Sequence, residues 1–260
     1  MMILLCNGDS WTQGDAPAQN INWSAKKTLD WYDIIPNFGS TTNKTTHELE
    51  YKFYNSDVWP KILGKKLGCE TWNAGRLGAS NDWITHTTIN SLEYLRKQGK
   101  TDVFVVVGWS SFMRWNRKYF HREKNFKHSA DKVPIINGSL EELEENSDLL
   151  TYNSVESILL LQDFLKARKI PYLFFNAFDN KNYEDIQSCS LNDFIDYDYI
   201  YKGSFEYTFK DYIQTFNDSK QWHSVNNEYF VTAHPKDKSH ILWGKELHRY
   251  IKENYNDIIF

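Results

Sequence analysis

The stretch Asp102–Val107, with the sequence Asp-Val-Phe-Val-Val-Val, decides the fold of this chain. A continuous run of β-branched and aromatic residues is typical of a strand that is buried on both faces. Such strands occur in parallel sheets, because helices cover each face of those sheets. The stretch therefore predicts an α/β protein with a parallel sheet at its centre.

Apolar runs and helical periodicities alternate on either side of this strand. They predict strands at 2–6, 69–73 and 171–176, and helices at 57–67, 81–98, 151–168 and 237–254. Alternation of strands and helices favours one open parallel sheet with helices on both sides. We expect a three-layer α/β/α sandwich of flavodoxin-like type, formed by residues 1–260 as a single domain.

Three long stretches interrupt the alternation, at 15–56, 111–150 and 178–233. Loops of this length in a compact domain are usually functional or have structure of their own. We expect them to be insertions that form a lid or a substrate wall.

The third insertion is rich in aromatic residues that alternate with other residues, as in Tyr197, Tyr199 and Tyr201. A spacing of two predicts a β-hairpin with one aromatic face, which would suit sugar rings. We favour the other interpretation, in which these rings form a small satellite core beneath a long loop.

Charge and composition exclude several classes of partner. The net charge is −4 and the isoelectric point is near 6.1, so we expect neither nucleic acid nor an anionic membrane as a partner. No apolar segment reaches the ~20 residues of a membrane helix. The apolar run at the N-terminus is too short for a signal peptide and leads directly into a polar turn. We expect a cytoplasmic or virion-associated protein.

The histidines and cysteines do not form metal-binding patterns. The eight histidines lie in no HExxH arrangement, and Cys6, Cys69 and Cys189 are too widely spaced for a CxxC motif. An odd cysteine count at wide spacing also does not indicate a disulfide framework. We therefore expect no structural or catalytic metal ion.

Polar turns follow the first three predicted strands. They are Gly8-Asp9-Ser10-Trp11, Asn73-Ala74-Gly75 and Gly108-Trp109-Ser110. In parallel sheets, ligands bind at the carboxyl ends of the strands, where these turns would meet. A serine hydroxyl that is exposed there can attack a carbonyl if a histidine takes its proton, which makes Ser10 a candidate nucleophile.

Together with His234-Pro235 before the last helix, these blocks resemble the SGNH hydrolases, the GDSL group of esterases and lipases. The resemblance extends from Gly8 to about Gly244. The third block is also similar to phage-encoded SGNH-like proteins that have Gly-Trp-Ser or Gly-Trp-Thr there. The resemblance implies the SGNH hydrolase fold and a carboxylic ester hydrolase that works by acyl transfer without a cofactor.

The resemblance also implies roles for single residues. Ser10 would be the nucleophile, and the backbone N–H groups of Ser10 and Gly75 would bind the oxyanion. The family usually has Gly-x-Asn in the third block, and here Ser110 takes the position of the asparagine. A hydroxyl can donate to the oxyanion with a shorter reach than an amide, and Asn81 or Arg114 are alternative donors.

Two histidines compete for the role of the base. His234 matches the family's His-Pro and is followed ten residues later by Gly244, but Val231 stands where the family has an aspartate. The competing frame is Asp237-x-x-His240. We favour His234, because it precedes the last helix and can reach the sheet edge, and we expect His240 to be a core or surface residue. Asp237 or a backbone carbonyl would then orient His234.

The sequence thus predicts a serine esterase that removes a small acyl group, such as O-acetyl, from a carbohydrate. Trp11, Trp109 and Arg114 would form part of the substrate wall. Two alternatives stay open. One is a non-catalytic SGNH-like protein that binds glycan or assembles into a phage particle, which the departures at Ser110 and Val231 favour. The other is an acyltransferase that uses the same serine.

Overall fold

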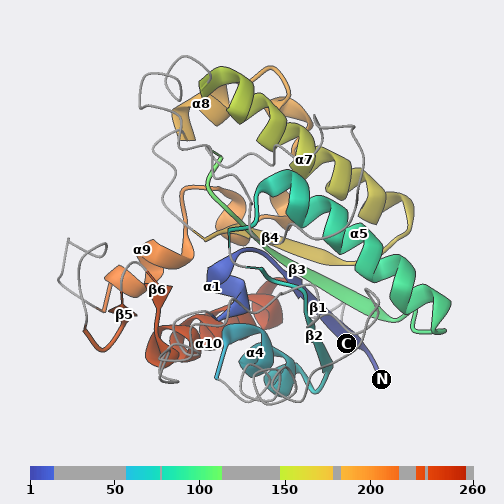
Figure 1. Cartoon of the computed structure of the whole chain (residues 1–260), viewed down its shortest axis with the longest axis vertical. Coiled ribbons are helices and arrows are strands. Elements are labelled where there is room, and N and C mark those ends of the chain that lie inside the picture. The colour runs from blue at the N-terminus through green and yellow to red at the C-terminus, as the bar shows by residue number, and fades with distance from the viewer. Residues whose placement is uncertain are drawn as a thin grey trace, which may run out of the picture.

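A computed structural model of the chain describes residues 1–14, 57–76, 78–112, 147–177, 183–216, 227–231 and 234–255 (Figure 1). The strands are β1 (Ile3–Asn7), β2 (Glu70–Asn73), β3 (Val103–Trp109), β4 (Tyr172–Asn176), β5 (Phe230–Val231) and β6 (His234–Pro235). The α-helices are α1 (Ser10–Gln13), α4 (Trp59–Leu67), α5 (Asn81–Lys97), α7 (Ser147–Ala167), α8 (Tyr183–Ser188), α9 (Phe209–Gln214) and α10 (Asp237–Asn254). The predicted insertions at 15–56 and 111–150 lie almost wholly outside these residues.

The main sheet has four parallel strands in the order β2-β1-β3-β4. Leu5 of β1 pairs with Trp72 of β2 on one side and with Val105 of β3 on the other. The chain moves outward from β1 to β2 and then returns to place β3 on the opposite side of β1. The strand order therefore reverses between β1 and β3, and ligands bind at such a switch point.

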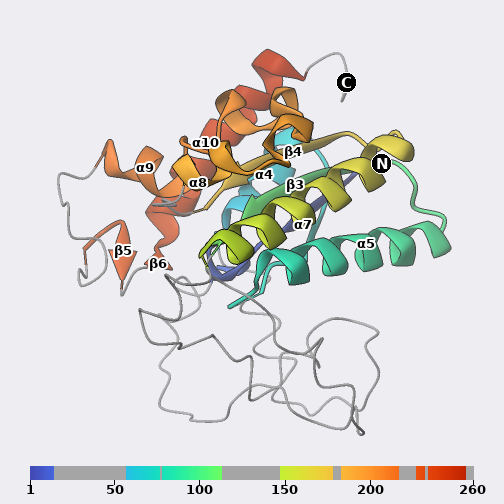
Figure 2. The ribbon, with the colours of Figure 1, turned by 90° about the horizontal axis from the view of Figure 1, so that it is seen from above.

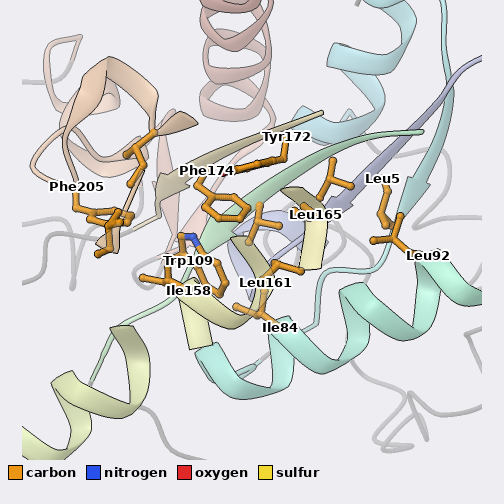
Figure 3. Close-up of a cluster of buried hydrophobic side chains, with 14 of the residues drawn as sticks. Leu5, Ile84, Leu92, Trp109, Ile158, Leu161, Leu165, Tyr172, Phe174 and Phe205 are labelled. Carbon is orange, nitrogen blue, oxygen red and sulfur yellow. The ribbon is translucent and has the colours of Figure 1, made fainter. Parts of the chain in front are cut away.

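Helices cover both faces of this sheet (Figures 1 and 2). Leu5 and Val105 face α5 and α7, whereas Leu4 and Phe104 face α4 and α10. Figure 3 shows the first of these two cores, in which Leu161 of α7 lies between Ile84 of α5 and the sheet strand that carries Phe174. The predicted α/β/α sandwich is confirmed, and its strands and helices lie close to the predicted ranges.

A close contact between two helices explains one small residue of the last block. α10 packs against α4, and a Cβ atom at Gly244 would lie 2.9 Å from Cγ2 of Ile62 and 3.2 Å from the carbonyl oxygen of Trp59. Real Cβ atoms do not approach other atoms so closely. A glycine at this position therefore allows the two helices to touch along their backbones.

The aromatic residues around Tyr199 do not form the hairpin that their spacing suggested. Residues Tyr197–Tyr199 and Tyr201–Gly203 form two short 3₁₀ turns, η4 and η5, which follow η3 (Asn192–Phe194). Their backbone N–H groups bond to carbonyls three residues earlier rather than to a partner strand, as from Ile200 to Tyr197. The rings pack into the two main cores instead, so the described part of this segment forms neither the hairpin nor a separate satellite core. The period of two therefore reflects turns against a core and not a pleated strand.

The structure also bears on membrane-spanning helices, metal-binding clusters and disulfides within the described residues. Among the described helices, none has the combination of length and apolarity that a membrane crossing requires. Three or more His, Cys, Asp or Glu side chains do not gather as metal ligands anywhere in the described ranges. Cys6, Cys69 and Cys189 are free thiols.

Two neighbouring leucines of α7 offer a matched test of the core in Figure 3. Leu161 is fully buried, whereas Leu160 is 51% exposed on the outer side of the helix. We expect Leu161→Ala to lower the free energy of unfolding by about 2–5 kcal/mol, because it leaves a cavity between α7 and the sheet. Leu160→Ala should change it by less than about 0.5 kcal/mol. Urea unfolding followed by circular dichroism measures both, and equal losses would contradict the layer assignment.

Candidate active site

The single-turn helix α1 begins at Ser10, directly after the carboxyl end of β1. Asp9 caps it, because its Oδ1 accepts the backbone N–H of Trp11 at 3.0 Å and its carbonyl oxygen accepts the N–H of Thr12. Gly14 ends the turn at φ +91°, a left-handed conformation that favours glycine. The sequence Gly-Asp-Ser therefore builds a short helix whose first residue is Ser10.

Ser10 is the first residue of α1. The residue is buried, and no described residue accepts a hydrogen bond from its hydroxyl or from its backbone N–H. An N–H group in the first turn of a helix has no partner within the helix and can bind an anion. The sequence led us to expect an exposed Ser10 hydroxyl, whereas Ser10 is only 2% exposed, and its roles as nucleophile and oxyanion donor stay predictions.

Three glycines at the ends of three strands surround Thr12 of α1. A Cβ atom at Gly8 would lie 2.2 Å from the Oγ1 atom of Thr12, and one at Gly108 would lie 3.1 Å from the same atom. A Cβ atom at Gly75 would lie 2.9 Å from Cβ of Thr12 and 2.7 Å from the backbone nitrogen of Gln13. The glycines form a socket that lets α1 sit directly on the edge of the sheet.

The Gly75 loop is tied to α1 by the side chain of Asn73. The Gly75 N–H donates to Oδ1 of Asn73 at 3.0 Å, and Nδ2 of Asn73 donates to the carbonyl oxygen of Thr12 at 3.0 Å. The next residue, Arg76, donates its N–H to the carbonyl oxygen of Gly8. The Gly75 N–H would therefore share its hydrogen between Asn73 and an oxyanion, and its role as a donor stays a prediction.

Ser110 lies beside Asp9 and is fully buried. Its hydroxyl donates to Oδ2 of Asp9 at 3.0 Å. The amide of Asn81 holds the Ser110 backbone on both sides, since Oδ1 accepts the Ser110 N–H at 2.9 Å and Nδ2 donates to the Ser110 carbonyl at 3.2 Å. The structure thus brings the first and third blocks together through Asp9.

Asn7, Asp9 and Asn73 have no predicted role, although they organise this edge. Nδ2 of Asn7 donates to the hydroxyl of Thr88 at 2.8 Å, and Oδ1 of Asn7 accepts the N–H of Gly8 at 2.8 Å. These bonds join the end of β1 to α5. The signal that marks all three residues in the sequence is a short polar side chain at the end of a predicted strand or in the turn that follows it.

His234 lies in β6, which pairs with β5 in antiparallel register, so that His234 is opposite position 231. β6 packs against α1, and the half-buried His234 is therefore on the same side of the molecule as Ser10. The ring of Trp11 contacts Phe230 of β5 at a centroid distance of 5.8 Å. These contacts bring the first and last blocks together.

The competing histidine, His240, lies in the core and is fully buried. Its Nδ1 accepts the backbone N–H of Trp59 at 3.3 Å, and burial lowers its pKa to about 3. Asp237 is exposed at the first position of α10. Partial desolvation and the negative charge of Asp57 raise the pKa of Asp237. His240 is therefore a neutral residue that stabilises the contact between α10 and α4.

The substrate wall was predicted to consist of Trp11, Trp109 and Arg114. Trp11 packs edge-on against Phe209 and Trp109 against Phe174, and both indoles are almost fully buried. This burial does not support the predicted contact of the two rings with a substrate. Arg114 lies outside the described residues.

A half-buried aromatic ring lies beside the Gly75 loop. The guanidinium carbon of Arg76 stands 4.7 Å from the ring centroid of Trp83, in the first turn of α5. Trp83 and Arg76 together form what we call the Arg76–Trp83 platform. It was not predicted from the sequence, because neither residue belongs to a recognisable block.

A family model described as a family of unknown function (DUF6071) matches residues 41–256. The chain belongs to the DUF6071 family. The matched residues of this DUF6071 protein include the Gly75, Ser110 and His234 blocks and begin after α1. No curated protein matches the chain.

Solved structures similar to the DUF6071 chain include several esterases. An acetyl xylan esterase from the rumen bacterium Butyrivibrio proteoclasticus is 11% identical with a TM-score of 0.45, and the match covers 98% of this chain and 64% of that one. A G-D-S-L family protein from Desulfitobacterium hafniense DCB-2 is 10% identical with a TM-score of 0.35, and the coverage is 95% and 98%. A carbohydrate esterase family 2 enzyme from Corynascus thermopiles is 11% identical with a TM-score of 0.43, and the coverage is 98% and 67%. The chain thus spans less than two thirds of the acetyl xylan esterase.

Gly75→Ala tests the socket beneath α1. The added methyl group would meet the Gln13 nitrogen and Thr12 side chain, so α1 must shift, and we expect a loss of about 1–3 kcal/mol in the free energy of unfolding. Gly99→Ala is the control, because φ +74° is its only strain and nothing lies within 4 Å of its Cβ position. A Gly75→Ala variant as stable as the wild type in thermal and urea unfolding would show that the socket is loose.

His240 should make the stability of the protein depend on pH. Its pKa is about 3 in the folded state and near 6.5 in an unfolded chain, so the unfolded state binds the extra proton as the pH falls below 6.5. The stabilising effect of neutral His240 is complete above pH 6.5 and disappears as the pH falls toward 3. We expect His240→Asn to reduce the difference in unfolding free energy between pH 7 and pH 4 by about 2–3 kcal/mol.

The control for this measurement is Leu161→Ala, which removes buried contacts but no titratable group. That variant should lower the free energy of unfolding by a similar amount at pH 7 and pH 4. An unchanged pH dependence in His240→Asn would mean that His240 is accessible to protons in the folded protein.

Proposed function

We propose that this protein is a serine hydrolase of carboxylic esters, with Ser10 as the nucleophile and His234 as the base. The observation that carries the proposal is the state of Ser10 at the start of α1. Its neighbours Asp9, Thr12 and Gln13 are held by hydrogen bonds, whereas the Ser10 hydroxyl and N–H donate to no described residue. Both groups lie at the switch point of the sheet, where substrates bind.

The proposed reaction has two steps. In the first, Oγ of Ser10 attacks the carbonyl carbon of the ester while His234 takes the hydroxyl proton. The oxyanion forms next to the N–H groups of Ser10 and Gly75, and the proton on His234 then passes to the departing alcohol. In the second step, water attacks the acyl-enzyme with His234 again as the base, which releases the acid and restores Ser10.

His234 needs a partner that keeps its proton on the correct nitrogen. Position 231, directly opposite His234 in the register of β5 and β6, holds valine. We propose that a backbone carbonyl orients His234, with Asp237 as the alternative. The aspartate of a serine triad acts chiefly by fixing the tautomer of the histidine, and a carbonyl oxygen can do the same.

For the substrate, we propose a small acyl ester on a carbohydrate, such as an O-acetyl group. The support is the Arg76–Trp83 platform near Gly75, where the Arg76 guanidinium lies over the half-buried Trp83 ring at 4.7 Å and joins an aromatic side chain to a cationic one. Sugars bind to such surfaces through their apolar ring faces and their hydroxyl groups.

A second candidate function is non-catalytic binding of an acylated glycan. Specific observations favour it: the Gly75 N–H and the Ser110 hydroxyl, two predicted oxyanion donors, already donate to Asn73 and Asp9. Transfer of the acyl group to a sugar instead of water would use the same Ser10 chemistry. That reaction is distinguished by adding a sugar acceptor and looking for the acylated product.

The test is hydrolysis of p-nitrophenyl acetate and of an acetylated xylo-oligosaccharide by the wild type, Ser10→Ala and His234→Ala. We expect both variants to lose at least about 10³-fold in kcat, because each removes one half of the nucleophile–base pair. His86→Ala, an exposed histidine on α5, is the control that should keep wild-type kcat.

The outcomes separate the candidates. Activity that persists in Ser10→Ala would overturn the proposal. Activity that persists in His234→Ala and disappears in His240→Asn would move the base to His240. If the wild type binds the acetylated oligosaccharide in calorimetry but hydrolyses neither ester, the binding function replaces the esterase.

A further inference from the structure

One buried hydrogen bond joins the nucleophile turn to the third block. The Ser110 hydroxyl donates to Oδ2 of Asp9 at 3.0 Å, across 101 positions of sequence, and both residues are fully buried. The other carboxylate oxygen of Asp9 accepts the Trp11 N–H and so caps α1. The two oxygens of the Asp9 carboxylate therefore bind different elements. Oδ1 accepts an N–H of α1, and Oδ2 accepts the hydroxyl of the residue that follows β3.

Ser110 is itself held in a fixed position. The side-chain amide of Asn81 bonds to both the N–H and the carbonyl of Ser110. A serine hydroxyl has a single hydrogen, and a bond to an ionised carboxylate is about twice as strong as a bond between neutral groups. An oxyanion would have to compete with Asp9 for this hydrogen, and removing it would leave a buried carboxylate oxygen with one partner fewer.

We infer that Asp9 and Ser110 form a positioning pair, in which Ser110 fixes the Asp9 carboxylate and Asp9 aims the first turn of α1 at the substrate. Ser110 then acts on the reaction through Asp9 and not as an oxyanion donor. The direct donor in this inference is the Ser10 N–H, and the Gly75 N–H would have to share its hydrogen with Oδ1 of Asn73. The catalytic part of this inference rests on the proposed esterase function, whereas its structural part does not.

The pair also affects the negative charge of the Asp9 carboxylate, which is next to Ser10 in the sequence. A bare carboxylate beside Ser10 would repel the developing oxyanion. The Trp11 N–H and the Ser110 hydroxyl each donate to one oxygen of Asp9, and these two bonds partly compensate its charge. Loss of Ser110 would therefore loosen α1 and leave the charge of Asp9 less compensated.

A double-mutant cycle on kcat distinguishes the two roles of Ser110. Ser110→Ala removes the hydroxyl, and Asp9→Asn keeps an N-cap oxygen for Trp11 but removes the charge. For a positioning pair we expect each single variant to lower kcat about 10- to 100-fold. The kcat of the double variant should then be no lower than that of the less active single variant. Ser110→Thr, which keeps the hydroxyl, should recover most of the activity. If Ser110 were a direct oxyanion donor, Ser110→Ala would instead lower kcat about 10²- to 10³-fold whether Asp or Asn stood at position 9. The losses from the two single variants would then multiply in the double variant.

A second measurement needs no turnover. Native-state hydrogen exchange at the Trp11 amide reports how well Asp9 caps α1, and we expect Ser110→Ala to accelerate it about tenfold or more. Ser157→Ala is the matched control, because this buried serine donates to the Asn153 carbonyl within α7, far from Asp9 along the chain and in another layer. It should leave both Trp11 exchange and kcat unchanged.

The two measurements separate failure of the inference from failure of the proposed function. Unchanged Trp11 exchange in Ser110→Ala, or multiplicative losses in the cycle, would overturn the positioning pair while leaving the esterase intact. A wild type without Ser10-dependent turnover would overturn the esterase, and accelerated Trp11 exchange in Ser110→Ala would still support the pair as the structural link between α1 and β3.

Discussion

The close approach of α1 to the sheet is the constraint on which the site depends. Thr12 can sit between the ends of β1, β2 and β3 only because Gly8, Gly75 and Gly108 have no side chains there. A β-carbon at any of the three would lift the helix, and the Ser10 N–H and hydroxyl would move with it. The glycines that look like generic turn residues in the sequence are thus steric requirements of the packing around α1. A Cβ atom at Gly108 would also meet the Phe175 ring at 2.7 Å, and one at Gly75 would meet the Gln13 nitrogen at 2.7 Å.

The regular layers could be predicted from the sequence because burial leaves a local signal. The run Asp102–Val107 is apolar throughout since both of its faces are covered, and helices such as 57–67 end at a glycine that the chain requires there. The segment around Tyr199 was predicted wrongly, because the same spacing arises when short 3₁₀ turns press alternate rings onto a core. Local pattern does not reveal which tertiary surface those rings find.

The candidate site could be predicted only in part, for a related reason. The blocks themselves and their meeting at one sheet edge follow from strand order, but the partner of each polar group does not. Ser110 occupies the position of a family donor, yet its hydrogen goes to Asp9, a residue 101 positions away. Asn73 and Asn81 likewise bond to backbone groups that only the folded chain brings near. A short polar side chain has several possible hydrogen-bond partners, and the folded chain decides which of them it contacts.

The outer edge of β4 has a consequence for the protein in solution. An uncovered edge strand presents a row of free N–H and C=O groups to which a second chain can add, and such edges promote aggregation. Here the segment after η4 runs beside β4, makes isolated bridges from Ile200 to Phe174 and from Thr208 to Asn176, and receives a bond from Nδ2 of Asn176 to the Phe205 carbonyl. This irregular chain occupies the edge without extending the sheet, so the aromatic segment also guards the fold against strand addition by another molecule.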